Sequence, residues 1–449
     1  MAIRKKQEPS EYQKALRKFH KKSNRHVVVF EADISEDEKR RIFSDADHLR
    51  QCGNELLGIM KRNLEQLLRT KRYRALQKLY GKVSDPIHAL EKKEVLSDEE
   101  TQKLNHLKKE RAELTNSMNQ MREFYQVTWD FCRTKMMELK EKYRLQSIFA
   151  LSRAEDIWAA IETILYSSGR RLHFKKRGDL PEIRAKQSTR GLVIDSSQSG
   201  LIVKYGKVTI PCKYKAKDLW LWDEEKAILA YLAEPELQDA HAVDQMSKGI
   251  ITDTYRPCFA SLVCKKIGGR LRVYVHITVE GKAISKRRKD STPRHYYGKG
   301  NIGCDIGTQT IAYTSNTEVG LENLAERGNS IQHVERQEAL ILRAMERSRR
   351  AMNPNHYNEN GTVKKGHKQW NFSKRYQKLK QRHQELCRIA AENRALAIRE
   401  QVNHLRSLGD CFITEPPNAK KLQKRANPEN PVDKNGQVTI CRICSKHHR

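Results

Sequence analysis

The sequence predicts a multidomain α+β protein in which a helical lobe and a small β-barrel precede an α/β domain. Three observations lead to this prediction. Apolar residues recur at helical spacing through residues 36–165, behind Ser-x-x-Glu motifs that are typical of helix starts. Short runs rich in Val, Ile and Tyr, separated by turn signals, fill residues 190–282. Strand and helix patterns then alternate through residues 301–414.

The charge of the chain indicates an anionic partner. Lys and Arg number 87 against 55 Asp and Glu in 449 residues, which gives a net charge of +32. Such a charge disfavours compaction unless an anion offsets it, so nucleic acid is the first partner to consider and an anionic membrane surface the alternative. No apolar run approaches the roughly 20 residues of a membrane helix, and the polar N-terminus does not resemble a signal peptide. We therefore expect a cytoplasmic protein without a membrane partner.

Helices are expected to dominate residues 35–170, after a basic arm and first strand at 1–34. Three motifs with the spacing of a capping box open them, each with Glu three positions after the serine, at Ser35, Ser97 and Ser152. The first helix is expected to reach about Tyr80 with a break near Gly53, and the second to reach Lys142. Their apolar stripes predict a helix–helix core.

Residues 171–299 are expected to hold the small barrel and a basic linker. Gly268-Gly269 is typical of a hairpin turn between its last two strands, and His276 in the final strand is interpreted as a packed residue. Residues 282–299 carry seven Lys or Arg against one Asp, with aromatic residues between them. This composition suits either a plain linker or a nucleic-acid channel. The candidate contacts in this segment are Lys286, Arg287, Arg288 and Lys289.

Two carboxylates follow apolar strands in the α/β part. Asp305 lies in Gly303-Cys-Asp-Ile-Gly307, between two expected strands, and Glu415 ends a strand at 411–414. The intervening residues predict two basic helices, at about 330–352 and 373–407, with Lys374 and Arg375 as candidate nucleic-acid contacts. Carboxylates at the ends of neighbouring strands could share Mg²⁺, which favours a few carboxylates, waters and a substrate phosphate. On spacing alone, an acid at a strand end is more often a turn former or a helix cap.

The order of these motifs resembles the RuvC nuclease domain of TnpB proteins. TnpB proteins are RNA-guided accessory nucleases of bacterial insertion sequences, often described as transposases, and are related to the type V CRISPR effectors. The resemblance rests on Gly303-Cys-Asp-Ile-Gly307, the following Ile311-Ala-Tyr-Thr, the basic helices, and Phe412-Ile-Thr-Glu415-Pro-Pro-Asn418. It extends to residues 350–366 and to 52–57 and 67–73, so it covers most of the chain.

The resemblance implies a fold, a metal and partners. Asp305 matches the first metal-binding aspartate and Glu415 the second acidic ligand of an RNase H-like, Mg²⁺-dependent endonuclease. Guide RNA and target DNA are the implied partners, without a small-molecule substrate, in the cytoplasm of a prokaryote in association with the nucleoid. The implied domains are a basic arm with the first wedge strand (1–34), a helical recognition lobe (35–170), a wedge-type barrel with a basic linker (171–299), a RuvC-like domain (300–420) and a polar tail (421–449).

The sequence departs from the family after the glutamate. Pro416-Pro417 follows it directly, where the family continues through a zinc ribbon with two C-x-x-C pairs and a third motif with another aspartate. Here only Cys441 and Cys444 have ligand spacing. They could bind Zn²⁺ as half of a ribbon, or be accidental if the tail arose by a frameshift. We expect an incomplete RuvC-like domain, caused by C-terminal truncation, in which two carboxylates fix the metal poorly.

Three interpretations of function therefore stand side by side. The first is an RNA-guided DNA endonuclease of the TnpB type, with cleavage weakened or lost because the third acidic motif is missing. The second is a nuclease-inactive protein that holds guide RNA and occupies DNA. The third is a generic basic RNA-binding protein, for which binding would be independent of a guide and would weaken steeply with salt.

Overall fold

The computed structural model describes residues 24–92, 97–166, 169, 171–234, 255–281, 283–307, 310–323 and 329–415, with the side chains of 329–332 left aside. The basic arm before residue 24 and the Cys441 and Cys444 motif lie outside these residues. The chain divides into two compact units, Met1–Thr292 and Pro293–Arg449. Each unit is described by itself.

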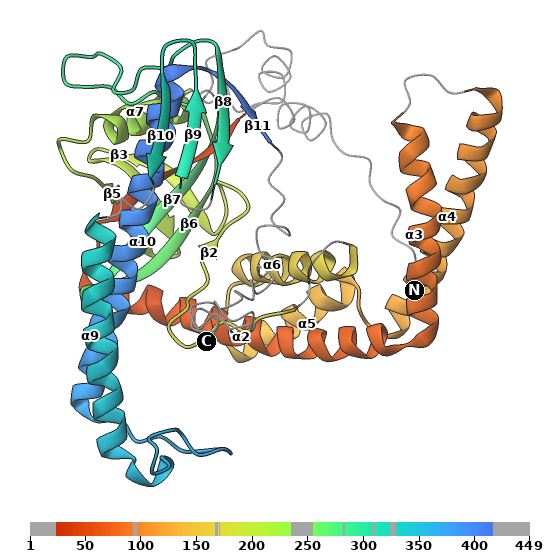
Figure 1. Ribbon diagram of the computed structural model, residues 1–449, viewed down its shortest axis with the longest axis horizontal. Helices are drawn as coiled ribbons and strands as arrows, with labels where there is room; N and C mark the ends of the chain where they lie inside the picture. Colours follow the sequence, from red (N-terminus) through yellow and green to blue (C-terminus); the bar gives the residue numbers. More distant parts are fainter. Residues whose placement is uncertain are drawn as a thin grey trace, which may run out of the picture. The chain divides into compact units, whose positions relative to one another are not determined.

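The helical part of the first unit, as far as the structure describes it, consists of five helices, which Figure 1 shows. They are α2 (Glu36–Arg69), α3 (Lys71–Glu91), α4 (Asp98–Phe124), α5 (Trp129–Lys142) and α6 (Ser147–Tyr166). The capping boxes predicted at Ser35 and Ser97 are confirmed, because each serine accepts from the backbone of the glutamate three residues on and that glutamate bonds back. The apolar stripes of α2, α5 and α6 bury a shared core around Leu56, Met136 and Ile161.

The predicted break near Gly53 is wrong. α2 continues through Gly53 and ends at Arg69, with Thr70 as the cap residue whose N–H donates to the Leu67 carbonyl. Gly53 instead allows close packing, since a Cβ there would lie 2.7 Å from Nε of Arg153 on α6. A small residue inside a long helix was thus a packing signal rather than a breaking signal.

Two further boundaries also differ from the sequence prediction. The second helix ends at Phe124 rather than Lys142, because Gln126 takes a positive φ and Thr128 then caps α5 by accepting from the backbone of Phe131. The predicted start at Ser152 is wrong as well. Ser152 lies inside α6, and its hydroxyl accepts from Nε of Arg184 at 3.1 Å.

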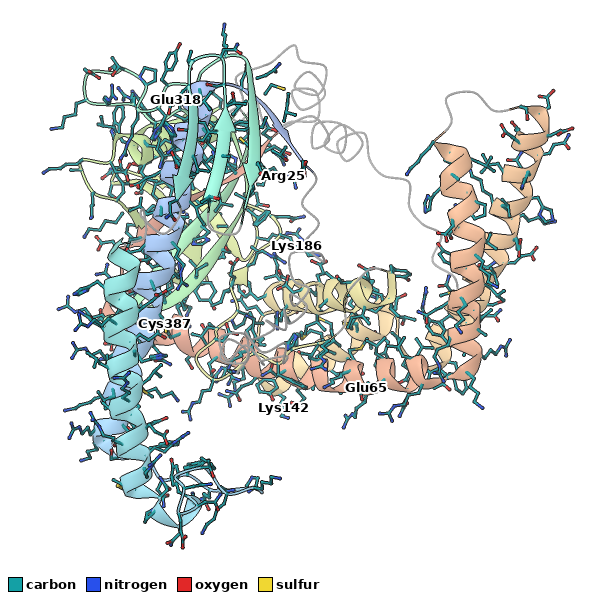
Figure 2. All side chains as sticks on the ribbon, viewed as in Figure 1. Arg25, Glu65, Lys142, Lys186, Glu318 and Cys387 are labelled. Atoms are coloured by element: carbon teal, nitrogen blue, oxygen red, sulfur yellow. The ribbon has the colours of Figure 1, made fainter. Side chains whose placement is uncertain are left out.

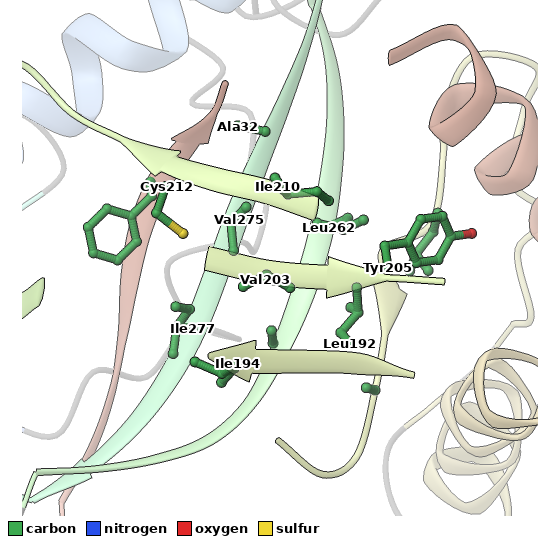
Figure 3. Close-up of a cluster of buried hydrophobic side chains, with 14 of the residues drawn as sticks. Ala32, Leu192, Ile194, Val203, Tyr205, Ile210, Cys212, Leu262, Val275 and Ile277 are labelled. Carbon is green, nitrogen blue, oxygen red and sulfur yellow. The ribbon is translucent and has the colours of Figure 1, made fainter. Parts of the chain in front are cut away.

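Seven antiparallel strands form the β part of the first unit. They are β1 (Arg25–Ala32), β2 (Ile183–Arg184), β3 (Leu192–Ser197), β4 (Gly200–Tyr205), β5 (Val208–Lys213), β6 (Tyr255–Ile267) and β7 (Arg270–Gly281). The order is β2-β6-β7-β1-β5-β4-β3, and the sheet curls so that β3 also contacts β6. Val203, Leu262, Val275 and Ile277 are fully buried inside this curl (Figure 3).

The expected barrel is therefore a curled antiparallel sheet whose described strands end at β2 and β3. The hairpin turn at Gly268-Gly269 is confirmed, because β6 and β7 pair on either side of it and both glycines have positive φ. A helix that the sequence did not predict, α7 (Leu219–Ala233), follows β5 and packs on this sheet.

The second unit combines a small sheet with a helical hairpin. Its elements are β8 (Asn301–Ile306), β9 (Thr310–Thr314), β10 (Val319–Asn323), α9 (Asn329–Met352), the short η3 (Pro354–His356), α10 (Lys374–Leu408) and β11 (Cys411–Thr414). The sheet order is β10-β9-β8-β11, with the first three strands antiparallel and β11 parallel to β8. The strands predicted at 301–306, 310–315 and 411–414 and both predicted helices are confirmed, whereas β10 was not predicted.

Two small cores hold the second unit together. Ile302, Cys304 and Tyr313 of the sheet pack with Leu405 of α10. Val334, Ile341, Leu386 and Ala390 join α9 to α10 farther along the hairpin. Among the described helices of the whole chain, none combines the length and the apolar character that crossing a bilayer demands.

Candidate functional site

The structure brings Asp305 and Glu415 to one edge of the four-stranded sheet. β11 runs parallel to β8 with Thr414 opposite Cys304, and the two acidic residues directly follow this last pair. Residues side by side in a parallel ladder point to the same face of the sheet. Both acidic residues are exposed. The two strand ends singled out in the sequence are thus adjacent in space, although 110 residues separate them in the chain.

Small neighbours leave the carboxylate of Asp305 open to solvent. Its partner across β9 is Ala312, and the residue two positions before it on the same face is Gly303. The alternate residues Ile302 and Cys304 are buried on the opposite face, against α10. The period of two along β8 therefore separates a core face from a face on which Asp305 stands accessible.

The position of β11 depends on two close backbone approaches. A Cβ at Gly409 would lie 2.5 Å from the carbonyl oxygen of Gly300, and a Cβ at Gly298 would lie 2.4 Å from that of Ser407. The N–H groups of Asp410 and Cys411 both donate to the Gly300 carbonyl at 3.1 Å, and the Asp410 carboxylate accepts from the Gly300 N–H at 2.9 Å. These contacts fix where α10 ends and thus the register that places Glu415 beside Asp305.

The electrostatic setting of the two carboxylates differs from that of the paired acidic residues on α9 and α10. Glu346 pairs with Arg349, and Glu385 pairs with Arg388. In the part of the chain that the structure describes, neither Asp305 nor Glu415 has an ion pair, and neither carboxylate has a hydrogen bond. Two adjacent carboxylates without a cation, in a chain of net charge +32, suit a hard divalent cation such as Mg²⁺, which takes oxygen ligands and keeps waters.

A compact loop joins α9 to α10 and forms the tip of the hairpin (Figure 1). We call residues 353–373 the tip loop. The buried amide of Asn353 closes it, because its Nδ2 donates to the Asn371 carbonyl and its Oδ1 accepts from the Asn371 N–H, both at 2.8 Å. Trp370 packs edge-on against His356, and the guanidinium of Arg349 lies 4.9 Å from the centre of the Trp370 ring. The loop is therefore anchored at both of its ends.

Basic side chains are exposed on this tip. They include the predicted contacts Lys374 and Arg375 at the start of α10, and Lys364 and Lys365 in the tip loop. None of these four side chains has an ion-pair partner within the described residues. Lys and Arg side chains without acidic partners are available to phosphates, whereas paired ones are partly neutralised.

The predicted run at 286–289 divides into two kinds of residue. Arg287 forms a bidentate pair with Asp223 of α7, with both N–O distances at 2.7 Å, and this hydrogen bonding raises the pKa of the guanidinium. Nζ of Lys286 lies 4.6 Å from the centre of the Trp220 ring. Arg288 and Lys289 are exposed. Arg287 thus has a structural partner, which the sequence did not reveal, while Arg288 and Lys289 remain accessible.

Aromatic residues beside these cations were missed by the sequence analysis. Trp222 on α7 is 43% exposed, and Nζ of Lys226 and the guanidinium of Arg287 lie within 4.8 and 5.9 Å of its ring centre. The signal was present in Trp220-Leu-Trp222, but helix α7 itself was not predicted. An exposed indole between cations is a surface on which a base can stack.

Comparison with known proteins assigns no family to the chain. Neither the family models nor the curated protein sequences match it. Among solved structures, it is similar to a chain of the "Cryo-EM structure of the Cas12f1-sgRNA-target DNA complex", with a TM-score of 0.34, 11% identity, and coverage of 93% of this chain and 92% of that chain.

Proposed function

We propose that this protein is an RNA-guided DNA-binding protein of the TnpB type, with a RuvC-like nuclease site at Asp305 and Glu415. The observation that supports the proposal is the parallel pairing of β11 with β8, in which Asp305 and Glu415 directly follow the last pair, Cys304 and Thr414. The sheet order β10-β9-β8-β11 also supports the proposal, because it sets the two strands that end in acidic residues beside each other.

Asp305 and Glu415 would hold Mg²⁺ through their exposed carboxylates. When bound, the ion supplies positive charge that stabilises the attacking and leaving oxygens of a phosphodiester. The residues of the chain hold and orient this ion, and the small side chains of Gly303 and Ala312 leave room for a backbone phosphate beside Asp305. Basic residues of the tip loop and of 286–289 would attract the nucleic acid electrostatically.

A specific observation favours a second candidate, a protein that binds without cutting. In the described residues, the sole group of three potential metal ligands lies elsewhere, at Glu338, His383 and Cys387, so no third carboxylate, His or Cys joins Asp305 and Glu415. Two ligands fix an ion less firmly than three, and in-line geometry is lost with small displacements. The second candidate is therefore a guided DNA-binding protein with weak or no cleavage.

The curled sheet and the helices of the first unit would bind the guide RNA and its duplex with DNA. The curled sheet of β1 to β7 would be the wedge that holds guide RNA, and helices α2 to α6 would line the guide–target duplex. Both protein surfaces would recognise the shape and the phosphates of the nucleic acid, because base pairing supplies the sequence specificity in guided systems.

The test separates guide binding from cleavage. We expect the chain, purified at high salt, to carry one discrete small RNA, and the complex to cut or occupy matching DNA. Asp305→Ala and Glu415→Gln should each lower Mg²⁺-dependent cleavage by at least about 100-fold, since several kcal/mol of charge stabilisation is removed. RNA binding should be unchanged. Glu400→Gln, an exposed acid of α10 in the same unit, is the matched control and should cut like the parent.

Each outcome has a distinct meaning. Cleavage that survives Asp305→Ala would remove that residue from the site. Discrete RNA and specific DNA binding without cleavage would support the second candidate. Heterogeneous RNA, with binding independent of sequence, would overturn the guided proposal altogether.

A further inference from the structure

A second set of potential metal ligands lies on the helical hairpin of the 293–449 unit. His383 and Cys387 are four residues apart on α10, so they project from the same face of that helix. Glu338 of α9 meets them, because the two helices pack antiparallel along this stretch. Cys387 is labelled in Figure 2 on this pair of helices. The three side chains come from two elements joined by the tip loop.

The three donor atoms are close together. Nε2 of His383 lies 2.9 Å from Oε1 of Glu338, Sγ of Cys387 lies 3.5 Å from the same oxygen, and Sγ lies 3.7 Å from Nε2. Bond lengths of about 2.3 Å to sulfur and about 2.0–2.2 Å to nitrogen and oxygen separate the donors of a tetrahedral zinc site by about 3.3–3.7 Å. The two separations that involve sulfur already have this size, and the hydrogen bond between His383 and Glu338 accounts for the shorter third.

We propose that Glu338, His383 and Cys387 bind a divalent transition-metal ion of the zinc class. A thiolate, an imidazole and one carboxylate form a mixed set that suits Zn²⁺ or Co²⁺ and is too soft for Mg²⁺. Water would complete the tetrahedron, because the described residues supply three ligands and Cys387 is exposed. Binding releases the thiol proton to solvent and replaces the proton on Nε2, so His383 then carries its proton on Nδ1.

The packing of the hairpin does not explain these side chains. The apolar contact between α9 and α10 is made by Val334, Ile341, Leu386 and Ala390, with partly buried neighbours. Cys387 faces solvent beside that core, so its thiol adds little buried area, and a hydrogen bond between Glu338 and His383 does not require it. A metal ion would join α9 to α10 between the small sheet and the tip loop. It would thereby restrain the helical hairpin whose tip carries the exposed lysines.

The experiment uses the full chain with Cys441→Ser and Cys444→Ser in place, which removes the other thiol pair with ligand spacing. Co²⁺ is the probe, because a cobalt–thiolate bond gives a charge-transfer absorption and tetrahedral cobalt gives characteristic visible bands. We expect one equivalent of Co²⁺ with both signatures, displaced by Zn²⁺. Adding Cys387→Ser should remove the charge-transfer band, and Glu338→Gln should weaken Co²⁺ binding by at least about 10-fold.

Matched controls keep the proposal falsifiable. Cys411→Ser alters another exposed thiol of the same unit and should leave both signatures unchanged. Asp305→Ala should also leave them unchanged, so failure of this site and failure of the nuclease proposal are distinguishable. The melting temperature in EDTA should be the same with and without Cys387→Ser, which verifies folding. Absence of the charge-transfer band before that substitution, or its persistence afterwards, would overturn the proposal.

Discussion

At the scale of single residues, His276 makes the stability of the first unit depend on pH. It lies on β7 between Val29 of β1 and Ser261 of β6. Burial lowers the pKa of its imidazole, the carboxylate of Glu182 opposes that shift, and Lys265 adds to it. The unfolded chain therefore binds this proton more readily than the folded one. Neutral His276 contributes fully to stability above about pH 6.5, the ordinary pKa of histidine. This contribution is lost as the pH falls below that value.

The lowered pKa of His276 predicts a measurable difference in stability between the parent protein and His276→Gln. We expect the free energy of unfolding of the parent to fall more steeply as the pH drops below about 6.5 than that of His276→Gln, which cannot take up the proton. Denaturant unfolding at a series of pH values, followed by a probe in the curled sheet, measures both slopes. Equal slopes would mean that other groups carry the pH dependence.

The two kinds of candidate site differ in how far single residues could be predicted. Asp305 and Glu415 were identifiable because each ends an apolar run, and ends of neighbouring strands can meet. The trio on the hairpin was not identified. His383 and Cys387 have helical spacing, but their partner Glu338 is 45 residues away and is brought to them by helix packing alone. Arg287 shows the same limit, since its bidentate partner Asp223 lies on a helix that the sequence did not predict.

At the scale of elements, the end of α10 controls the acidic edge of the small sheet. Gly409 is buried where the chain passes from α10 to β11, and its φ of −178° is open to any residue, so space rather than backbone strain is decisive. Gly409→Ala would put a Cβ 2.5 Å from the Gly300 carbonyl oxygen and 2.8 Å from Cγ1 of Ile302. We expect a loss of about 2 kcal/mol in the stability of this unit, as for other overpacked sites. Hydrogen exchange at the β11 amides should accelerate.

A glycine with free space is the control for that substitution. Gly81 lies inside α3, and nothing is within 4 Å of a Cβ built there. Gly81→Ala should stabilise the helix by about 0.5–1 kcal/mol, because alanine has the higher helix propensity. If both substitutions changed stability in the same direction, close packing at Gly409 would not be the reason for its effect.

Element boundaries show where local sequence signals were sufficient. The boxes at Ser35 and Ser97 use side chains within four residues of each other, so their prediction needed no tertiary information. Ser152 has the same spacing, yet α6 already begins at Ser147, and the Ser152 hydroxyl accepts from Arg184 of another segment. Gly53 likewise reflects the approach of Arg153. At Gly53 the deciding factor was long-range packing, whereas the end of α4 was set locally by the positive φ of Gln126 and the Thr128 cap.

At the scale of the whole molecule, the net charge of +32 is the property that any account of function must explain. Part of the positive charge is offset within the fold, as in the pairs of Arg40 with Asp37 and of Lys135 with Glu138. The exposed lysines and arginine of the hairpin tip have no such acids beside them among the described residues. These four cations therefore belong to the part of the positive charge that the described residues do not offset.

This distribution predicts a position-dependent effect of salt on nucleic-acid binding. Each phosphate that a cation neutralises adds about 0.7–0.9 to the slope of log K against log salt. Replacing Lys364, Lys365, Lys374 and Arg375 by Gln should therefore reduce the magnitude of that slope by up to about 3, measured by filter binding to single-stranded RNA and to duplex DNA at several salt concentrations.

The control variant removes an equal number of positive charges, four, at sites that already have acidic partners. These are Arg40, Lys61, Arg133 and Lys135, which pair with Asp37, Glu65, Asp130 and Glu138. If net charge alone drove binding, the two fourfold variants would lose affinity equally, because bulk attraction depends on the total. If the tip contacts phosphates, only the tip variant should lower the salt slope, since counterions are released at the contact itself. A flatter slope in the control alone would place the nucleic acid on the helical part of the first unit instead.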